Sequence, residues 1–404
     1  MVNKKINKLA SNCSSCITKP CQIGCPLNND ITAFIKEIKR HKYKKAFDIL
    51  SSTSILMPIC GRICPHIKQC EGACIKGNST KKVLIGKLET FIGDMWLKQN
   101  WPIRSPKKTT KKVAVIGSGP AGLTCAAFLR KNGIGVTIYE KHNYLGGLLS
   151  HGIPKFRLPK KIVKNVINNI INLGIDVKYN TELGKDISIE ELKNEYDAIF
   201  LAIGANVSNN LNIPGEKLLN VYGANELLEN KKSINYHNKI VTIIGGGNTA
   251  IDISRTIKRL GPKSIQVIYR GEEIAMKADP QEVSEAKKEG IDFLFNTNIT
   301  KIIGKDKVNA IEVVKTTVKE KINYQITCDY VIKAIGSHPD SVIEILPIDK
   351  VDFSISIDND GKTSDEKVFA GGDITETKRT VAWASRSGRN AAYGIIKYLG
   401  NQID

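Results

Sequence analysis

The sequence predicts a multidomain protein of the mixed α+β and α/β class, with a small helical domain before two domains of alternating strands and helices. Eight of the ten cysteines lie between Cys13 and Cys74, which marks the N-terminal part as chemically distinct. Two glycine-rich segments, 117–122 and 245–250, each follow a short apolar run and open a helical pattern. Because this strand–glycine–helix order is typical of βαβ units that bind nucleotides, we expect two Rossmann-like domains.

A chain of 404 residues is long enough for several hydrophobic cores. We expect the second nucleotide-binding domain to be inserted into the first. The expected segments are a helical domain at 1–100, a linker at 101–112, the first part of a nucleotide-binding domain at 113–235, an inserted second such domain at 236–333, and the rest of the first at 334–404.

In the helical domain, Asn29 or Asp30 can cap a helix whose apolar residues recur at helical spacing over 31–38. A second apolar stripe, at 85–95, predicts another helix. Further expected elements are strands at 113–116, 136–139, 240–244 and 264–269, a helix that ends at Leu129, and a last strand and helix between Val368 and Tyr398.

Positive charge is concentrated at the N-terminal end. Residues 1–112 hold 22 Lys and Arg against 6 Asp and Glu, which is +16 of the chain's net +20. We therefore expect this part to dock an acidic protein through an attraction that weakens with salt. The sequence has no nucleic-acid motif, no run of 18 apolar residues and no apolar signal core. We expect a cytoplasmic protein that binds neither nucleic acid nor membranes.

The clustered cysteines predict metal ligands, because a disulfide framework is unusual in a long chain without an export signal. The spacing is Cys-x2-Cys-x4-Cys-x3-Cys-Pro from Cys13 and Cys-x3-Cys-Pro-x4-Cys-x3-Cys from Cys60. Structural zinc is the alternative. Triplets that end in Cys-x3-Cys-Pro instead favour 4Fe–4S clusters of the ferredoxin kind, in which the cysteine before proline serves the other cluster.

That rule divides the thiols between two clusters. The expected ligands of the first cluster are Cys13, Cys16, Cys21 and Cys74. The expected ligands of the second are Cys25, Cys64 and Cys70, with either Cys60 or a group other than a thiolate as the fourth.

The first glycine segment is followed, 18 residues after Gly122, by Glu140, which can accept hydrogen bonds from ribose hydroxyls. A carboxylate there repels a 2′-phosphate, so this site suits FAD or NAD. Near the C-terminus, Asp373 precedes a helix and can bind a ribityl hydroxyl, while the helix start offers N–H groups to a flavin ring. The features together favour FAD. The expected contacts are Gly117, Gly119, Pro120, Ala121, Gly122, Glu140, Gly372, Asp373, Thr380 and Val381.

The second segment ends in Ala250, and Arg270 stands 20 residues further on in place of an acid. A guanidinium there can pair with the 2′-phosphate of NADP. The following Gly271, Glu272 and Glu273 dilute that preference, so NADP(H) is favoured and NAD(H) stays the alternative. The expected cofactor contacts are Gly245, Gly247, Asn248, Thr249, Ala250 and Arg270, with Gly336 where the chain returns to the first domain.

These residues together resemble the glutamate synthase small-subunit family. That family includes the N-terminal half of dihydropyrimidine dehydrogenase and the large subunit of NADH-dependent ferredoxin:NADP oxidoreductase. The resemblance runs from Cys13 to Tyr398. Its most specific pieces are Pro-Cys-Gln-Ile-Gly-Cys-Pro at 20–26, Ile-Cys-Gly-Arg-Ile-Cys-Pro at 59–65, Cys-Glu-Gly-Ala-Cys at 70–74, Gly-Gly-Leu-Leu-x-x-Gly-Ile-Pro at 146–154, Phe-Arg-Leu-Pro at 156–159 and Gly-Gly-Asp at 371–373.

The resemblance implies that NAD(P)H gives hydride to FAD and that the flavin passes single electrons to two 4Fe–4S clusters. It implies Glu89, after the triplet Gly-Lys-Leu, as the fourth ligand of the second cluster in preference to Cys60. It also adds Gly147, Leu148 and Arg157 to the flavin site.

We therefore expect an NAD(P)H-dependent oxidoreductase that contains FAD and iron–sulfur clusters and passes electrons to a partner subunit or carrier. One alternative is an electron-bifurcating subunit of the ferredoxin:NADP oxidoreductase type. The other is a non-catalytic scaffold that holds flavin and clusters. No residue is assigned a catalytic role.

Overall fold

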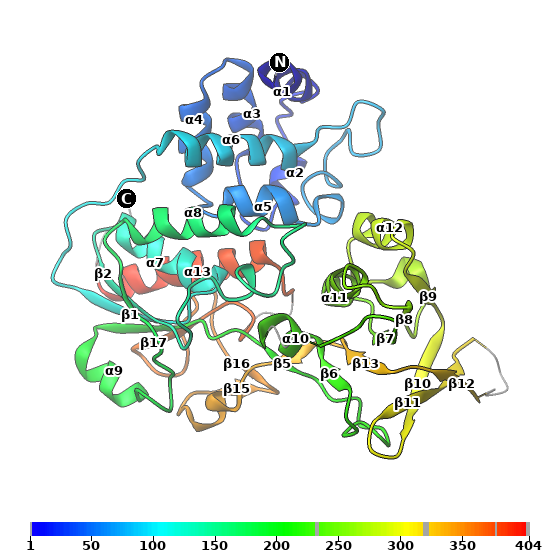
Figure 1. The fold of residues 1–404 in the computed structure, drawn as a ribbon. Helices are drawn as coiled ribbons and strands as arrows, with labels where there is room; N and C mark the ends of the chain where they lie inside the picture. Colours follow the sequence, from blue (N-terminus) through cyan, green and yellow to red (C-terminus); the bar gives the residue numbers. More distant parts are fainter. Residues whose placement is uncertain (1, 231–233, 318–322, 376–377, 401–404) are drawn as a thin grey trace. The chain divides into compact units, whose positions relative to one another are not determined.

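The computed structural model describes residues 2–230, 234–317, 323–375 and 378–400. Two units are distinguished by their internal packing: the first comprises 1–150, 155–204 and 341–404, and the second comprises 151–154 and 205–340. Figure 1 shows the elements of both units. The expected boundaries at 235/236 and 333/334 stay predictions. The described residues 205–230, 234–235 and 334–340 pack with the second unit. In the described part of the chain, no helix is long and apolar enough to cross a membrane.

The first unit begins with a helical domain, residues 1–101. Its helices are α1 (Val2–Ser11), α2 (Pro20–Ile23), α3 (Ile31–Lys39), α4 (Tyr43–Ser51), α5 (Met57–Ile63) and α6 (Ile85–Gln99). The predicted helices at 31–38 and 85–95 are confirmed as α3 and α6. Asp30 caps α3, because its Oδ1 accepts a hydrogen bond from Ala33 N at 3.2 Å. The core includes Phe47 of α4, whose ring stacks on Trp96 of α6 at 5.5 Å.

A parallel sheet follows in the same unit, with strand order β17-β4-β1-β2-β3. The strands are β1 (Lys112–Ile116), β2 (Gly135–Tyr139), β3 (Asp176–Lys178), β4 (Ala198–Leu201) and β17 (Val368–Ala370). Residues 113–116 and 198–201 are all buried, as expected for parallel strands that are covered on both faces. The last strand pairs with β4, so the C-terminal segment completes the sheet that the first glycine segment begins.

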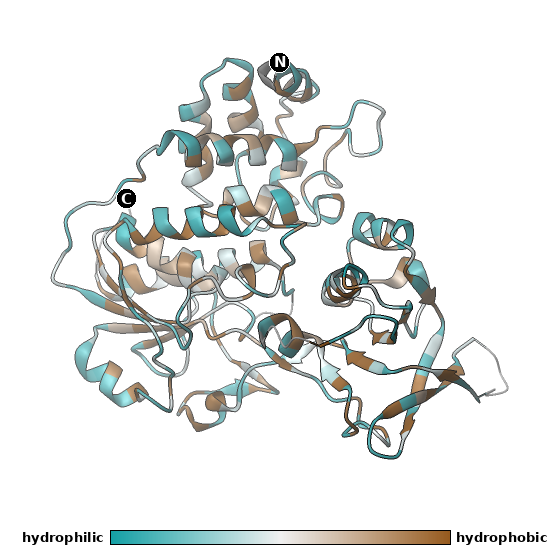
Figure 2. Ribbon diagram, in the orientation of Figure 1, coloured by the Kyte–Doolittle hydropathy of each residue, from teal (hydrophilic) through white to brown (hydrophobic). Residues whose placement is uncertain are grey.

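Three helices pack on this sheet: α7 (Pro120–Lys131), α9 (Ile189–Glu195) and α13 (Val381–Tyr398). A further helix, α8 (Lys160–Ile171), packs on α5 and α7. In Figure 1, α7 and α13 lie side by side. A Cβ on Gly388 of α13 would lie 2.1 Å from the carbonyl oxygen of Ala121, so only glycine permits this approach. Figure 2 shows α8 with alternating hydrophilic and hydrophobic stretches, which fits its single buried stripe of Val163, Val166, Ile167 and Ile170.

The second unit contains a parallel sheet of order β6-β13-β7-β8-β9. Its strands are β6 (Val221–Gly223), β7 (Ile240–Ile244), β8 (Ser264–Ile268), β9 (Asp292–Leu294) and β13 (Tyr330–Lys333), and its helices are α10 (Ala224–Asn230), α11 (Asn248–Lys258) and α12 (Pro280–Lys288). An antiparallel sheet is formed by β10 (Thr297–Gly304), β11 (Val308–Lys315) and β12 (Asn323–Thr327). The predicted strand at 240–244 is confirmed, and the one at 264–269 ends one residue earlier.

Candidate functional site

Four cysteines of the helical domain line one cavity. They are Cys13, Cys16, Cys21 and Cys74. Burial, and then the neighbouring Cys74, raises the pKa of Cys21 to about 11. Lysine side chains fix the backbone beside these thiols, because Lys39 Nζ donates to Cys13 O and Lys76 Nζ donates to Asn12 O, each at 2.7 Å. The cavity therefore brings together the four ligands that the sequence predicts for a first cluster.

A second group of acidic side chains comes from α5, α6 and the loops after α2 and α5, with Cys60, Cys70 and Glu89 buried and Cys25 and Cys64 half-buried. It contains Cys25, Cys60, Cys64, Cys70 and Glu89, each of which lies close enough to act on the pKa of others in the group. Burial, and then Glu89, raises the pKa of Cys25 to about 11. Both candidates for the fourth ligand are thus in this group. Cys60 and Cys64 act on each other's pKa, whereas Glu89 acts on the pKa of all four thiols.

Glu89 is a carboxyl group in the protein interior, where carboxylates are rarely found. It is 6% exposed, and burial raises its pKa to about 8. Asn29 Nδ2 donates to Glu89 Oε1 at 3.5 Å, and Thr53 Oγ1 donates to Asn29 Oδ1 at 2.7 Å. Asn29 was expected only as an alternative helix cap, so its contact with Glu89 was missed. No sequence signal links positions 29, 53 and 89, because the contact depends on packing.

The donor set fits iron–sulfur clusters. Buried thiols and a buried carboxyl lose protons readily only beside a metal, since the metal charge offsets the cost of desolvation. Among the described residues, no three His, Cys, Asp or Glu side chains could hold a single metal ion. In a 4Fe–4S cluster the cysteine thiolates surround a group of iron atoms instead of meeting at one ion.

The loop between β1 and α7 is shaped to accept a ligand. Gly117 has φ +98°, and a Cβ there would lie 2.5 Å from Ala202 O. A Cβ on Gly122 would lie 2.0 Å from Gly117 O, so helix and loop are in direct contact. At Gly119, by contrast, nothing lies within 4 Å of a Cβ position. The loop is therefore closely packed at both ends and open in the middle, at the N-terminus of α7.

Glu140 follows β2 and reaches back to this loop. Its Oε2 accepts hydrogen bonds from Ser118 N at 3.1 Å and Ser118 Oγ at 2.5 Å, and its Oε1 accepts from His142 N at 3.0 Å. Ser118 Oγ also accepts from Gly146 N at 3.0 Å. Ser118, which the sequence analysis did not select, thus joins the loop, the acid and the segment at 146–149. Its position inside the Gly-x-Gly motif was the available signal.

Other predicted flavin-site residues converge on the same loop. A Cβ on Gly147 would lie 3.1 Å from the Cα of Gly119, and one on Gly372 would lie 2.8 Å from the Cβ of Ala121. Thr380 caps α13, because its Oγ1 accepts from Trp383 N at 3.3 Å. Further predicted residues of the first unit that are half-buried are Pro120, Leu148, Arg157, Asp373 and Val381.

The loop between β7 and α11 in the second unit has the same arrangement as the loop between β1 and α7. Gly245 has φ +142°, and a Cβ there would lie 2.2 Å from Ala334 O. Nothing lies within 4 Å of a Cβ position on Gly247. Ala278 N donates to Gly246 O at 3.0 Å, and the Tyr269 ring packs on Gly246. A second loop is therefore open in the middle at a helix N-terminus.

The remaining predicted residues of this unit differ in burial. Asn248 Oδ1 accepts from Asp279 N at 2.9 Å, which ties the start of α11 to that of α12. Thr249 is half-buried and Ala250 is buried. Arg270 is exposed, and its backbone oxygen accepts from Thr316 Oγ1 at 3.1 Å. Gly336 has φ +104° and packs within the second unit.

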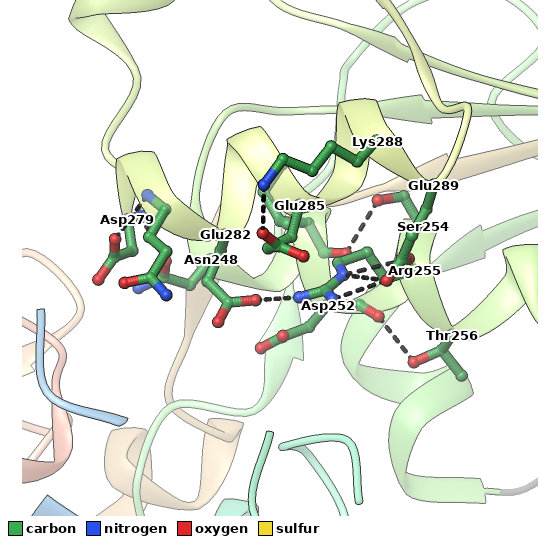
Figure 3. A network of polar contacts seen from close by, with 12 residues as sticks. Asn248, Asp252, Ser254, Arg255, Thr256, Asp279, Glu282, Glu285, Lys288 and Glu289 are labelled. Atoms are coloured by element: carbon green, nitrogen blue, oxygen red, sulfur yellow. Dashed lines mark hydrogen bonds and ion pairs between the residues drawn. The ribbon is translucent and has the colours of Figure 1, made fainter. Parts of the chain in front are cut away.

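A network of ion pairs joins α11 to α12 (Figure 3). Arg255 donates through Nη2 to Glu289 at 2.7 Å and through Nη1 to Glu282. Arg259 Nη2 also donates to Glu289, at 2.7 Å. Burial opposes ionisation, yet the two arginines lower the pKa of Glu289 to about 2. The network holds the two helices together.

Comparison with protein families finds two matches. Residues 111–388 match the pyridine nucleotide-disulphide oxidoreductase family, and residues 1–101 match the family described as dihydropyrimidine dehydrogenase domain II, 4Fe-4S cluster. Among solved structures, FprA from Mycobacterium tuberculosis in complex with NADPH aligns with a TM-score of 0.63 at 19% identity, over 72% of this chain and 85% of FprA. At that identity the likeness supports the fold alone.

Several curated proteins are similar over nearly the whole chain. The glutamate synthase [NADPH] small chain of Escherichia coli is 33% identical over 96% of this chain and 90% of its own length. The corresponding protein of Azospirillum brasilense is 31% identical, over 98% and 89%. The NAD-dependent dihydropyrimidine dehydrogenase subunit PreT of Salmonella typhimurium is 32% identical, over 97% and 94%. The resemblance and the fold class predicted from the sequence are confirmed. The chain belongs to the pyridine nucleotide-disulphide oxidoreductase family, and within it to the glutamate synthase small-chain group of oxidoreductases that use FAD, NADP(H) and 4Fe–4S clusters.

Proposed function

We propose that this chain takes electrons from a nicotinamide nucleotide bound in its second unit and delivers them, in the cytoplasm, to a separate acceptor protein. The observation that carries the proposal is the pairing of two groups of buried and half-buried cysteines with an open glycine loop in one compact unit. Bound FAD would accept hydride and bound 4Fe–4S clusters would carry single electrons. The residues of the chain bind and orient these groups.

In the first unit, the N–H groups at the start of α7 would bind the FAD pyrophosphate, for which Gly119 leaves room. Glu140 would accept a hydrogen bond from the adenosine ribose through Oε1, because Oε2 already accepts two from Ser118 and Oε1 accepts only one, from His142 N. The capped N-terminus of α13 would face the flavin with Asp373 before it.

Each cysteine group would hold one cluster. Cys13, Cys16, Cys21 and Cys74 would hold the first. Cys25, Cys64, Cys70 and Glu89 would hold the second. Glu89 is favoured over Cys60 because it is a buried carboxyl that acts on the pKa of every thiol of the group.

In the second unit, Gly247 leaves room for the pyrophosphate of NAD(P)H, and the exposed Arg270 would pair with a 2′-phosphate. We expect Arg270→Ala to raise the KM for NADPH about 10-fold or more, because a charge-assisted hydrogen bond is worth about 1.5–3 kcal/mol. The KM for NADH should stay unchanged. Lys301→Ala, which removes an exposed cation from β10, is the matched control.

The acceptor would be an acidic protein or a larger catalytic subunit that docks on the helical domain. Two isoleucines next to first-cluster ligands are exposed, Ile17 by 98% and Ile75 by 65%. Exposed apolar residues beside a redox centre in a strongly basic domain suit an acidic partner with an apolar contact area. Electron delivery should then slow as ionic strength rises, and Ile17→Ser should slow it without changing reduction by NADPH.

The test is an anaerobic absorbance titration of the cluster-replete protein with NADPH and, separately, with NADH. Bleaching of flavin and cluster bands by substoichiometric NADPH, with a weaker response to NADH, is the expected result. An equal or stronger response to NADH would leave the electron transfer in place and reject the role of Arg270. Absence of bleaching with both nucleotides would reject the proposal in favour of the scaffold.

A further inference from the structure

Arg389 is a buried cation that the flavin-binding and cluster-binding motifs do not include. It lies on α13 and is 9% exposed. Its Nη1 donates to Leu27 O at 2.8 Å and to Thr53 O at 2.7 Å, both in the helical domain. The preceding Gly388 packs α13 directly on Ala121 of the first glycine loop. The guanidinium is therefore held rigidly between the helix that closes the flavin site and the domain that carries the cysteines.

The two carbonyl groups that Arg389 binds lead to the second cysteine group. Leu27 is two residues after Cys25, and the charge of Arg389 acts on the Cys25 thiol. Thr53 Oγ1 donates to Asn29 Oδ1, and Asn29 Nδ2 donates to Glu89. Arg389 is thus linked to the second group along two routes, one through the backbone after Cys25 and one through Thr53 and Asn29.

A fixed positive charge in a site of low dielectric constant affects electron transfer. A 4Fe–4S cluster gains a negative charge on reduction, and its potential depends on nearby charge and hydrogen bonds. Groups that hydrogen bond to metal ligands orient them and tune the metal. In the helical domain, Arg389 donates to the backbone oxygens of Leu27 and Thr53, and these residues lead to Cys25 and Glu89 of the second group.

We propose that Arg389 is a positioning residue of the second cluster, which holds the Cys25 loop and the Thr53–Asn29–Glu89 chain in place and raises the reduction potential of that cluster alone. The inference rests on the proposed function, because it assumes that Cys25 and Glu89 bind a cluster. Its consequence is that the helix closing the flavin site also makes the second cluster easier to reduce than it would be without Arg389.

The test is a potentiometric titration of the holoprotein followed by EPR, with Cys13→Ser used to assign the first-cluster signal. In Arg389→Gln we expect the midpoint potential of the second cluster to fall and that of the first to stay within error of the wild type. Arg389→Lys, which retains the charge, should restore most of the difference. Thr53→Val, which is nearly isosteric and loses the hydroxyl donor, should change the EPR line shape of the second cluster only.

Lys131→Met is the matched control. Lys131 is also a cation of the flavin-binding part, and its Nζ donates to Ser51 O of the helical domain at 2.8 Å. If contact between the domains were all that mattered, Lys131→Met and Arg389→Gln would shift both clusters alike, which would overturn the inference. Unchanged second-cluster potential and line shape in Arg389→Gln and Thr53→Val would also overturn it. If Arg389→Gln does not fold, the potential and EPR line shape of the second cluster in Thr53→Val decide whether the inference stands. A wild-type protein without two cluster signals would instead contradict the proposed function.

Discussion

Replacing Arg255 with Met should loosen α12 of the second unit. The guanidinium is buried and donates to Glu289 and Glu282, so its loss removes the central donor of the network in Figure 3. Glu289 keeps its hydrogen bonds with Arg259. The change should therefore weaken the attachment of α12 to α11 without unfolding the unit.

The size of the expected loss of stability follows from the pKa of Glu289. Its pKa falls from the model-peptide value of 4.5 to about 2 in the folded chain, which at full strength corresponds to about 3 kcal/mol. The side chain is 23% exposed, so solvent screening reduces this figure, and retained pairing with Arg259 reduces it further. We expect Arg255→Met to lower the free energy of local unfolding of α12 by about 2 kcal/mol.

The sign of the pH dependence follows from the same group. Because the folded-state pKa is depressed, the stabilisation is complete above pH 4.5 and is lost as the pH falls toward 2. The wild type should therefore lose stability of α12 in that window. Arg255→Met should show a shallower decline, since less stabilisation is left to lose.

The assay is hydrogen exchange of the α12 amides measured by mass spectrometry, because a chain of several domains need not unfold in one step. A change of about 2 kcal/mol accelerates exchange about 30-fold. Lys288→Met is the control, since the Lys288–Glu285 pair is 69% and 42% exposed and should contribute little. Exchange in Arg255→Met within twofold of the wild type, or equal acceleration in Lys288→Met, would refute the reasoning.

Three further changes test the sites. Gly247→Ala should leave folding and FAD content intact, because nothing lies within 4 Å of the new methyl group. It should weaken NAD(P)H binding about 10-fold in a fluorescence titration, because the methyl group would take up room that the pyrophosphate needs. Unchanged affinity would contradict binding of the nucleotide at this loop. Gly388→Ala forces a methyl group to 2.1 Å from Ala121 O, so thermal unfolding monitored by flavin fluorescence should begin several degrees lower at a cost of about 1–3 kcal/mol. Cys60→Ser should retain both EPR cluster signals while Glu89→Ala loses one, and the reverse pattern would make Cys60 the fourth ligand.

The sequence determined the order and type of the main elements, because their signals are local. Apolar strands that lead into glycine segments predicted β1 with α7 and β7 with α11, since the close approaches at Gly117 and Gly245 require glycine in any fold of this kind. The spacing of the cysteines divided the thiols into two groups. The structure brings the first group together in one cavity and the second around Glu89.

Only the tertiary structure decided which distant residues support these sites. The sequence left Asn29 and Asp30 as alternative helix caps; Asp30 caps α3, and Asn29 donates to Glu89, 60 residues away. Arg389 is 362 residues from Leu27, whose carbonyl oxygen it binds. Such contacts leave no periodic or spacing signal in one sequence, since they arise where elements with separate local signals pack together. The local motifs therefore identify the cofactors, and the packing of α13 on the helical domain places the Arg389 charge beside the loop that follows Cys25.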